Sequence, residues 1–184
     1  MLVTILGPDG TGKTTLAKAL ADKTDGLDYV YFGGSNESRK YRIFERFIKS
    51  ELNNIFLRVI RKVLRVINDF DIYYQAKKNH IISDRCPIDN YIITKIQDRK
   101  IRHYYYVILL FSPNPDLVIL LNGDAEIIFK RKEELSVNEI RKYIKYYQEY
   151  LNNKQINYCM IDTVENDIEN TLRIAKSELD TRLS

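Results

Sequence analysis

Short apolar runs alternate along this chain with longer segments in which apolar residues recur at helical spacing. The runs predict strands at residues 3–6, 27–32, 80–83, 117–121 and 156–161. Helical spacing predicts helices over 14–22, from 87 onward, over 125–132, 137–151 and 168–179, and over a long stretch, 37–78, that breaks near residues 53 and 68. This alternation is typical of a parallel sheet with helices on both faces, a three-layer α/β/α fold.

Two local signals refine this outline. Residues 117–121 are apolar at every position, which is typical of a central strand covered on both faces. Asp124 follows that run and is expected to cap the helix that begins at Ala125.

Length and composition narrow the class of protein. A chain of 184 residues predicts one domain, residues 1–184. The net charge of +4 suits a polyphosphate site without indicating nucleic acid, so no nucleic-acid partner is expected. There is no apolar run of about 18 residues and no leader pattern, so no membrane partner is expected. Cys86 and Cys159 form no metal or redox motif, which favours a reducing cytoplasmic setting with both thiols buried.

The strongest motif is Gly-Pro-Asp-Gly-Thr-Gly-Lys-Thr-Thr at residues 7–15, directly after the first predicted strand. It matches G-x-x-x-x-G-K-[ST], the phosphate-binding P-loop, in the required context of a strand before it and a helix after it. Backbone N–H groups of such a loop cradle phosphate oxygens, a lysine reaches the β- and γ-phosphates, and a threonine holds Mg²⁺. The predicted ATP-phosphate ligands are Gly7, Asp9, Gly10, Thr11, Gly12, Lys13, Thr14 and Thr15.

Two aspartates, Asp84 and Asp9, are further candidates for the site. Asp84 and Arg85 end the strand predicted at 80–83, and ligands of open α/β sheets gather at such carboxyl ends. Asp84 can bind Mg²⁺ through water or act as a base, and Arg85 can clamp a substrate phosphate. The alternative is a structural ion pair. Asp9 lies inside the P-loop. It either accepts a proton or hydrogen bond from the acceptor or helps to place the metal, or it only stabilises a turn.

The charged run Lys130-Arg131-Lys132-Glu133-Glu134 follows the helix after the central strand. Cations on a closing segment can neutralise charge on a transferred phosphoryl group, which predicts a short lid at about 130–138. An ordinary solvated charge run is the alternative.

Basic residues interleave with apolar ones over residues 38–65. Two amphipathic helices with basic solvent faces are the simplest interpretation, with one or two arginines facing an acceptor pocket as a variant. A membrane-surface or nucleic-acid role lacks a supporting motif. His80 and His103 are expected to be structural.

Together these stretches resemble the thymidylate kinase family of P-loop nucleoside monophosphate kinases. The matching elements are residues 7–15, Ile81-Ile82-Ser83-Asp84-Arg85, Pro115-Asp116 with the strand and Asp124 that follow, and Arg131-Lys132-Glu133-Glu134-Leu135. Their order fits nearly the whole chain, although Cys86-Pro87 and Phe32-Gly33-Gly34-Ser35 depart from the family pattern, which marks a divergent member.

The resemblance implies a P-loop NTPase fold, ATP as phosphoryl donor, Mg²⁺ held by Thr14 and Asp84, nucleotide substrates and a homodimer, for which residues 43–67 are a candidate interface. It also implies catalytic roles for Lys13, Asp9, Asp84 and Arg85. Family members with glycine at the position of Gly10 rely on a lid arginine, which favours Arg131.

The predicted function is ATP-dependent phosphoryl transfer to a nucleoside monophosphate, with dTMP as the leading acceptor. A deoxynucleoside or other small-molecule kinase is the alternative, followed by a nucleotide-binding protein without catalysis. A GTPase switch is disfavoured because Asn153-Lys154-Gln155-Ile156 has Ile where guanine recognition needs Asp.

Overall fold

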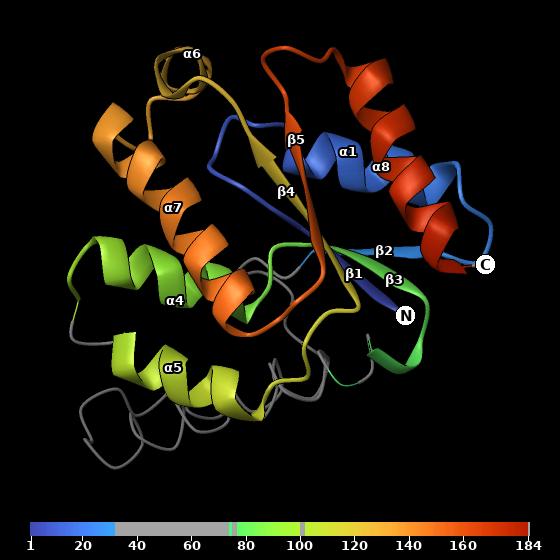
Figure 1. Cartoon of the computed structure of the whole chain (residues 1–184), viewed down its shortest axis with the longest axis horizontal. Helices are drawn as coiled ribbons and strands as arrows, with labels where there is room; N and C mark the ends of the chain where they lie inside the picture. The colour runs from blue at the N-terminus through green and yellow to red at the C-terminus, as the bar shows by residue number, and fades with distance from the viewer. Residues whose placement is uncertain (32–73, 75–76, 100–101, 184) are drawn as a thin grey trace, which may run out of the picture.

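A five-stranded parallel sheet forms the centre of the molecule (Figure 1). The computed structural model describes residues 1–31, 74, 77–99 and 102–183. The strand order is β2-β3-β1-β4-β5, and all neighbouring pairs are parallel. The strands are β1 (Leu2–Leu6), β2 (Asp28–Tyr31), β3 (Ile81–Asp84), β4 (Leu117–Asn122) and β5 (Tyr158–Asp162).

Helices cover both faces of the sheet, which confirms the three-layer α/β/α prediction. One face packs against α1 (Lys13–Asp22) and α8 (Ile168–Leu183), which lie side by side in Figure 1. The other face packs against α4 (Pro87–Ile96), α6 (Ala125–Arg131) and α7 (Val137–Asn153), and α5 (Arg102–Phe111) packs on α4.

The pleat of the strands divides the core into two halves. Val3 and Ile5 of β1 point toward α1 and α8, whereas Leu2 and Leu6 point toward the opposite helices. All five residues of β1 are buried, because the strand is central and covered on both sides.

The pairing of β1 with β3 places the two main sequence motifs side by side. Ile5 lies opposite Asp84, so the P-loop after β1 and the Asp84-Arg85 doublet leave the sheet at the same edge. A buried hydrogen bond of 2.8 Å between the Thr4 and Ser83 hydroxyls joins the two strands just below that edge. The site is therefore built on rigid core elements.

Most predicted elements are present, with boundaries that shift by a few residues. The last strand begins at Tyr158 instead of residue 156, and the pattern assigned no element to α5, whose run Tyr104–Phe111 has no polar position to mark a helical face. Asp124 caps α6 as predicted, accepting from the backbone N–H groups of Glu126 and Ile127.

The prediction of two buried thiols is half wrong. Cys86 is buried, but Cys159 is only partly so, because β5 is an edge strand. The predictions for residues 37–73 and the dimer segment 43–67 lie outside the described residues. Within the described part of the chain, no helix is both long and apolar enough to span a bilayer.

Candidate active site

The P-loop folds tightly between the sheet and α6. Gly7 has φ +147°, and a Cβ there would lie 2.5 Å from the Leu121 carbonyl oxygen, so only glycine fits. A Cβ on Gly10 would approach the Ile128 carbonyl oxygen at 3.1 Å, which shows how closely the loop meets the last turn of α6. Thr11 closes the turn by donating its hydroxyl to the Pro8 carbonyl at 2.8 Å.

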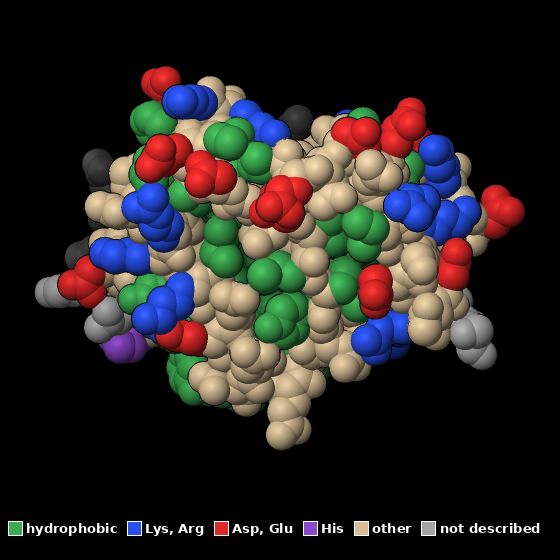
Figure 2. All heavy atoms as spheres, turned by 45° about the horizontal axis from the view of Figure 1, so that its top comes forward, with side chains coloured by type: hydrophobic (Ala, Val, Ile, Leu, Met, Phe, Trp, Pro, Cys, Tyr) green, Lys and Arg blue, Asp and Glu red, His purple; other side chains and the backbone are tan. Residues whose placement is uncertain are grey.

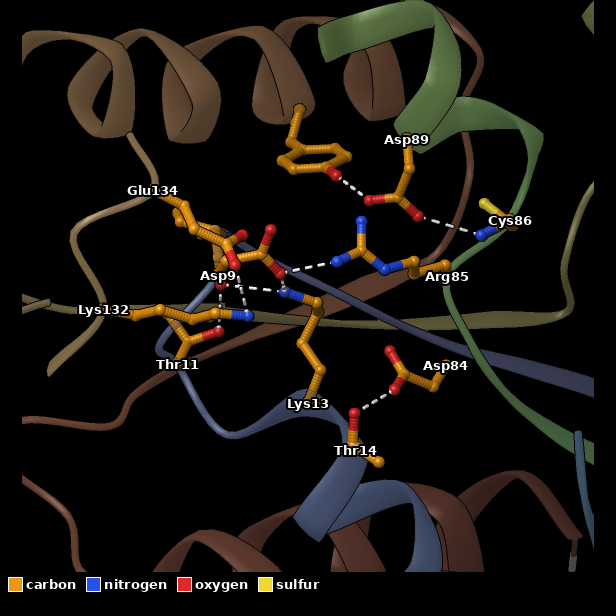
Figure 3. Close-up of polar contacts among 12 residues, drawn as sticks. Asp9, Thr11, Lys13, Thr14, Asp84, Arg85, Cys86, Asp89, Lys132 and Glu134 are labelled. Atoms are coloured by element: carbon orange, nitrogen blue, oxygen red, sulfur yellow. Dashed lines mark hydrogen bonds and ion pairs between the residues drawn. The ribbon is translucent and has the colours of Figure 1, made fainter. Parts of the chain in front are cut away.

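Lys13, at the start of α1, turns back over the loop and is 5% exposed. Its Nζ donates to the Pro8 carbonyl at 2.9 Å and to Asp9 Oδ1 at 3.1 Å (Figure 3). The ammonium group is thus already oriented by the loop whose N–H groups would receive phosphates.

Asp9 joins the P-loop to the end of β3. Its Oδ1 also accepts from the Arg85 guanidinium at 2.6 Å (Figure 3). Burial by itself would raise the pKa of Asp9, but Lys13 and Arg85 outweigh burial and lower that pKa to about 2. Asp9 is therefore a carboxylate at neutral pH, held by two cations.

Thr14 and Asp84 supply the oxygen atoms that would bind a metal ion in this site. The Thr14 hydroxyl donates to Asp84 Oδ2, and Asp84 is 1% exposed. The other carboxylate oxygen, Oδ1, is buried and has no hydrogen-bond partner among the described residues. A buried, unpaired carboxylate oxygen beside a hydroxyl matches the hard oxygen ligands that Mg²⁺ requires, so these residues fit the predicted metal.

Arg85 follows β3 with a left-handed backbone, φ +74°, which is uncommon for a residue with a side chain. Its side chain extends between Asp9 and Asp89 (Figure 3). Burial by itself would lower the pKa of Arg85, but Asp89 and then Asp9 raise it above its usual range. The guanidinium is thus fixed as a cation at the edge of the site.

Asp89 is the residue that the sequence interpretation missed. It is 3% exposed, its Oδ1 accepts from the Tyr147 hydroxyl of α7, and its Oδ2 accepts from the Cys86 backbone N–H at 2.9 Å. The available signal was an acid at the third helical position after Cys86-Pro87, which indicated a capping role only.

The predicted lid, residues 130–138, spans the end of α6, a short turn and the start of α7. Arg131 Nη1 donates to the Thr163 carbonyl at 3.1 Å, on the side of β5 and α8. Lys132 pairs with Glu134 at 3.0 Å on the side of Asp9 (Figure 3). The two neighbouring cations therefore face different parts of the site.

Two cavities flank the P-loop. The larger, about 620 Å³, lies between Gly12, Thr15, Arg131 and the loop from Thr163 to Ile168. The smaller, about 260 Å³, is lined by Asp9, Lys13, Thr14, Tyr31, Arg85 and Lys132. Figure 2 shows the face that carries α6 and the β5–α8 connection, where acidic and basic side chains are interspersed around apolar ones.

The fold is shared with solved nucleotide and nucleoside kinases. Thymidylate kinase from Candida albicans matches with TM-score 0.71 and 20% identity over 98% of this chain and 91% of that one. Deoxyadenosine kinase from M. mycoides with bound dATP matches with TM-score 0.66 and 17% identity over 98% and 100%. The same kinase with dCMP and dCDP matches with TM-score 0.64 and 18% identity over the same shares. These likenesses establish a thymidylate-kinase-like P-loop fold.

None of the curated proteins matches the sequence. One family model does, that of the ATPase family associated with various cellular activities (AAA), over residues 3–120. This span runs from β1 through the P-loop and the Asp84-Arg85 doublet into β4, and it covers more than half of the chain. The chain therefore belongs to the ATPase family associated with various cellular activities (AAA).

Proposed function

We propose that the protein is a kinase that transfers the γ-phosphoryl group of ATP to a nucleoside monophosphate, with dTMP as the leading acceptor. The observation that carries this proposal is the convergence of Lys13, Asp84 and Arg85 at one end of the sheet. Lys13 and Arg85 line the smaller cavity, and the larger cavity adjoins it across the P-loop. A donor and an acceptor need separate binding spaces that meet at the transferred group.

The P-loop is the donor-phosphate site in this proposal. Its backbone N–H groups and Lys13 bind the β- and γ-phosphates, and the larger cavity beside Arg131 takes the rest of ATP. Thr14 and Asp84 hold Mg²⁺, which supplies neutralisation of phosphate charge when bound.

The acceptor enters the smaller cavity, where Lys13 and Thr14 of the donor-phosphate site meet Arg85. Arg85 binds the acceptor phosphate with its planar fork. An oxygen of that phosphate bonds to the γ-phosphorus while the bond to the β,γ-bridging oxygen breaks, which yields ADP and a diphosphate. Arg131 neutralises the transferred group when the lid closes, and Lys132 is the alternative cation because it already lines the smaller cavity.

A deoxynucleoside kinase is the second candidate, and one observation favours it. Arg85 is already paired with Asp9 at 2.6 Å, and an acceptor without phosphate demands fewer free cations. In that case Arg85 would orient the acceptor hydroxyl and sugar.

One experiment tests both candidates. Purified protein is incubated with ATP, Mg²⁺ and, one at a time, dTMP, dUMP, other monophosphates and free nucleosides, and acceptor-dependent ADP formation is measured. The proposal expects turnover with a monophosphate, and with dTMP fastest. Turnover with free nucleosides alone would select the second candidate. No acceptor-dependent turnover, with ATP still bound, would indicate a nucleotide-binding protein without catalysis. The Lys13→Ala variant controls for contaminating kinases.

The proposal extends to a homodimer, as the family resemblance implies. Light scattering coupled to gel filtration measures the mass in solution, where a dimer has twice the chain mass of 21.8 kDa. A mass of one chain at working concentrations would contradict this part of the proposal.

A further inference from the structure

Asp89 makes more contacts than a helix cap requires. Its Oδ2 accepts from the Cys86 N–H, which satisfies the first turn of α4, while its Oδ1 accepts from the Tyr147 hydroxyl of α7. Both residues are almost completely buried. Removing a carboxylate from water is unfavourable unless partners compensate for it.

The molecule contains a second capping box that serves as an internal comparison. At the start of α7, Glu139 accepts from the Ser136 backbone N–H and hydroxyl, and Ser136 is exposed while Glu139 is partly exposed. Capping therefore needs neither burial nor a buried tyrosine. The extra partner and the burial of Asp89 point to another role.

The nearest candidate for that role is Arg85. Burial is the largest influence on Asp89 and raises its pKa above the ordinary value, although Tyr147, Lys13 and Arg85 act in the opposite direction. In Figure 3 the Arg85 side chain lies between the carboxylates of Asp9 and Asp89. Asp9 of the P-loop accepts a hydrogen bond from the guanidinium at 2.6 Å, whereas Asp89 of α4 lies on its other side and acts on it through charge.

We propose that Asp89 and Tyr147 are positioning residues that orient the Arg85 guanidinium toward the acceptor. This inference rests on the proposed function, because it names the residues that prepare the acceptor-binding arginine. Arg85 extends from a left-handed backbone at the end of β3, and a flexible arginine there would sample many orientations. Asp89 restricts it, and Tyr147 restricts Asp89 from the helix that follows the lid. The acceptor then binds a guanidinium that is already oriented, so less conformational freedom is lost on binding.

The test uses the full chain and changes single polar groups. Tyr147→Phe removes only the hydroxyl, and Asp89→Asn keeps an oxygen for the cap but removes the charge. Tyr150→Phe is the matched control, since Tyr150 lies on the same helix and packs on Tyr91 at 5.9 Å between ring centroids. In the described part of the chain, the side chain of Asp89 bonds Tyr147 and the Cys86 N–H, and not Tyr150. We expect both test variants to raise the acceptor KM about tenfold, with the ATP KM and the control unchanged within about twofold.

A double-variant comparison separates positioning from a general structural effect. In an Arg85→Ala background, Tyr147→Phe should change the acceptor KM by less than about twofold, because its effect passes through Arg85. An equal loss in both backgrounds, or a parallel rise in the ATP KM, would overturn the inference.

A spectroscopic readout keeps the inference independent of the proposed reaction. In the ligand-free wild type, NMR should detect the Arg85 side-chain N–H groups as restricted in rotation, and Tyr147→Phe should release that restriction. Unchanged Arg85 signals would overturn the inference even if the enzyme is active. A wild type with restricted Arg85 but no turnover of any acceptor would overturn the proposed function and support the positioning role.

Discussion

The P-loop region and the lid region carry the same kind of charge but hold it differently. Lys13 is 5% exposed and makes two hydrogen bonds within its loop, and Asp9 connects it to Arg85. Lys132 has a side chain that is 47% exposed and pairs only with exposed Glu134 among the contacts described for it, while Arg131 bonds a backbone carbonyl.

The P-loop groups are therefore oriented before a ligand binds, whereas the lid cations are free to move when one does. A buried network keeps its geometry without ligand, whereas exposed ion pairs contribute little and rearrange easily. Groups that must neutralise charge only in the transition state are well suited to the second arrangement. Under the proposed function, variants in the P-loop should therefore abolish activity, and variants in the lid should weaken it.

Of the variants in the two regions, Lys13→Ala should cause the largest loss of activity. Loss of the buried ammonium removes charge neutralisation at the β- and γ-phosphates, and we expect kcat to fall about a thousandfold. Steady-state kinetics and thermal unfolding measure activity and folding together. Lys18→Ala on the exposed side of the same helix is the control. Near-normal activity in a folded Lys13→Ala protein would refute the P-loop as the catalytic site.

Asp84→Asn and Arg85→Ala should separate two functions within the pre-organised region. Asp84→Asn should lower kcat about a hundredfold and shift the Mg²⁺ dependence, because it weakens the buried oxygen donor. Arg85→Ala should mainly raise the acceptor KM. Titrations of Mg²⁺ and acceptor measure these effects, with Asp28→Asn at the exposed start of β2 as control. If both variants behave like the wild type, the doublet is structural.

Arg131→Ala should show an intermediate effect. If Arg131 acts only at the transition state, kcat and kcat/KM should fall together by about tenfold to a hundredfold, with little change in ATP affinity. Arg131→Lys should rescue part of the loss, since an ammonium lacks the planar fork. Arg141→Ala, at an exposed arginine of α7, is the matched control.

Parallel kinetics on Lys130→Ala and Lys132→Ala sharpen this prediction. A large loss at Lys132 with none at Arg131 would move the catalytic role to the cation that lines the smaller cavity. Values within about twofold of wild type for all three variants would make the lid a solvated helix end.

The Asp9 network should also appear in the pH dependence of stability. The pKa of Asp9 is lowered from 3.8 to about 2, so its ionised form stabilises the folded state. That contribution is present above the unfolded pKa and is lost as pH falls toward 2; it is on the order of 2 kcal/mol. Denaturant unfolding should show Asp9→Asn less stable at pH 6, with the difference shrinking toward pH 3. A constant difference across this range would contradict the ion-pair explanation.

Asp124→Ala should have the smallest effect on activity. Asp124 accepts from two backbone N–H groups at 2.9 and 3.0 Å and thereby starts α6, which carries the lid cations. Loss of the cap should lower the free energy of unfolding by about 1 kcal/mol. We expect kcat to change less than about threefold, because the cap supports the helix without touching substrates. Asp124→Asn, which retains an acceptor, should recover most of the stability.

The parts of the fold that the sequence predicted are those with strong local signals. Residues 7–15 carry a motif whose glycines and lysine have few other uses, and the fully apolar run at 117–121 marked the central strand. The segment Arg102–Phe111 was missed because nearly uniform apolarity hides a helical face. Cys159 was expected to be buried because sequence alone does not reveal that β5 lies at the sheet edge.

Some residues of the candidate site could be identified from local sequence signals, and others could not. Asp84 and Arg85 could be selected from the sequence because they end a buried strand beside a P-loop strand. Asp89 could not, because its partner Tyr147 lies 58 residues away on another helix. The sequence also could not predict that the side chains of Arg131 and Lys132 point in different directions. Adjacent residues at a helix end take directions that only the surrounding loops define.

By itself, the sequence determined the strand–loop–helix of the P-loop motif, the alternation that builds a parallel sheet, and the acid–arginine doublet at a strand end. These features follow from backbone geometry and from burial patterns that neighbouring residues specify. Tertiary structure alone decided that Asp9 joins Lys13 to Arg85, that Tyr147 bonds Asp89 near Arg85, and that the two lid cations face different cavities. The physical reason is that the charge and orientation of these groups depend on partners distant in sequence, which come together only when the sheet and its helices pack.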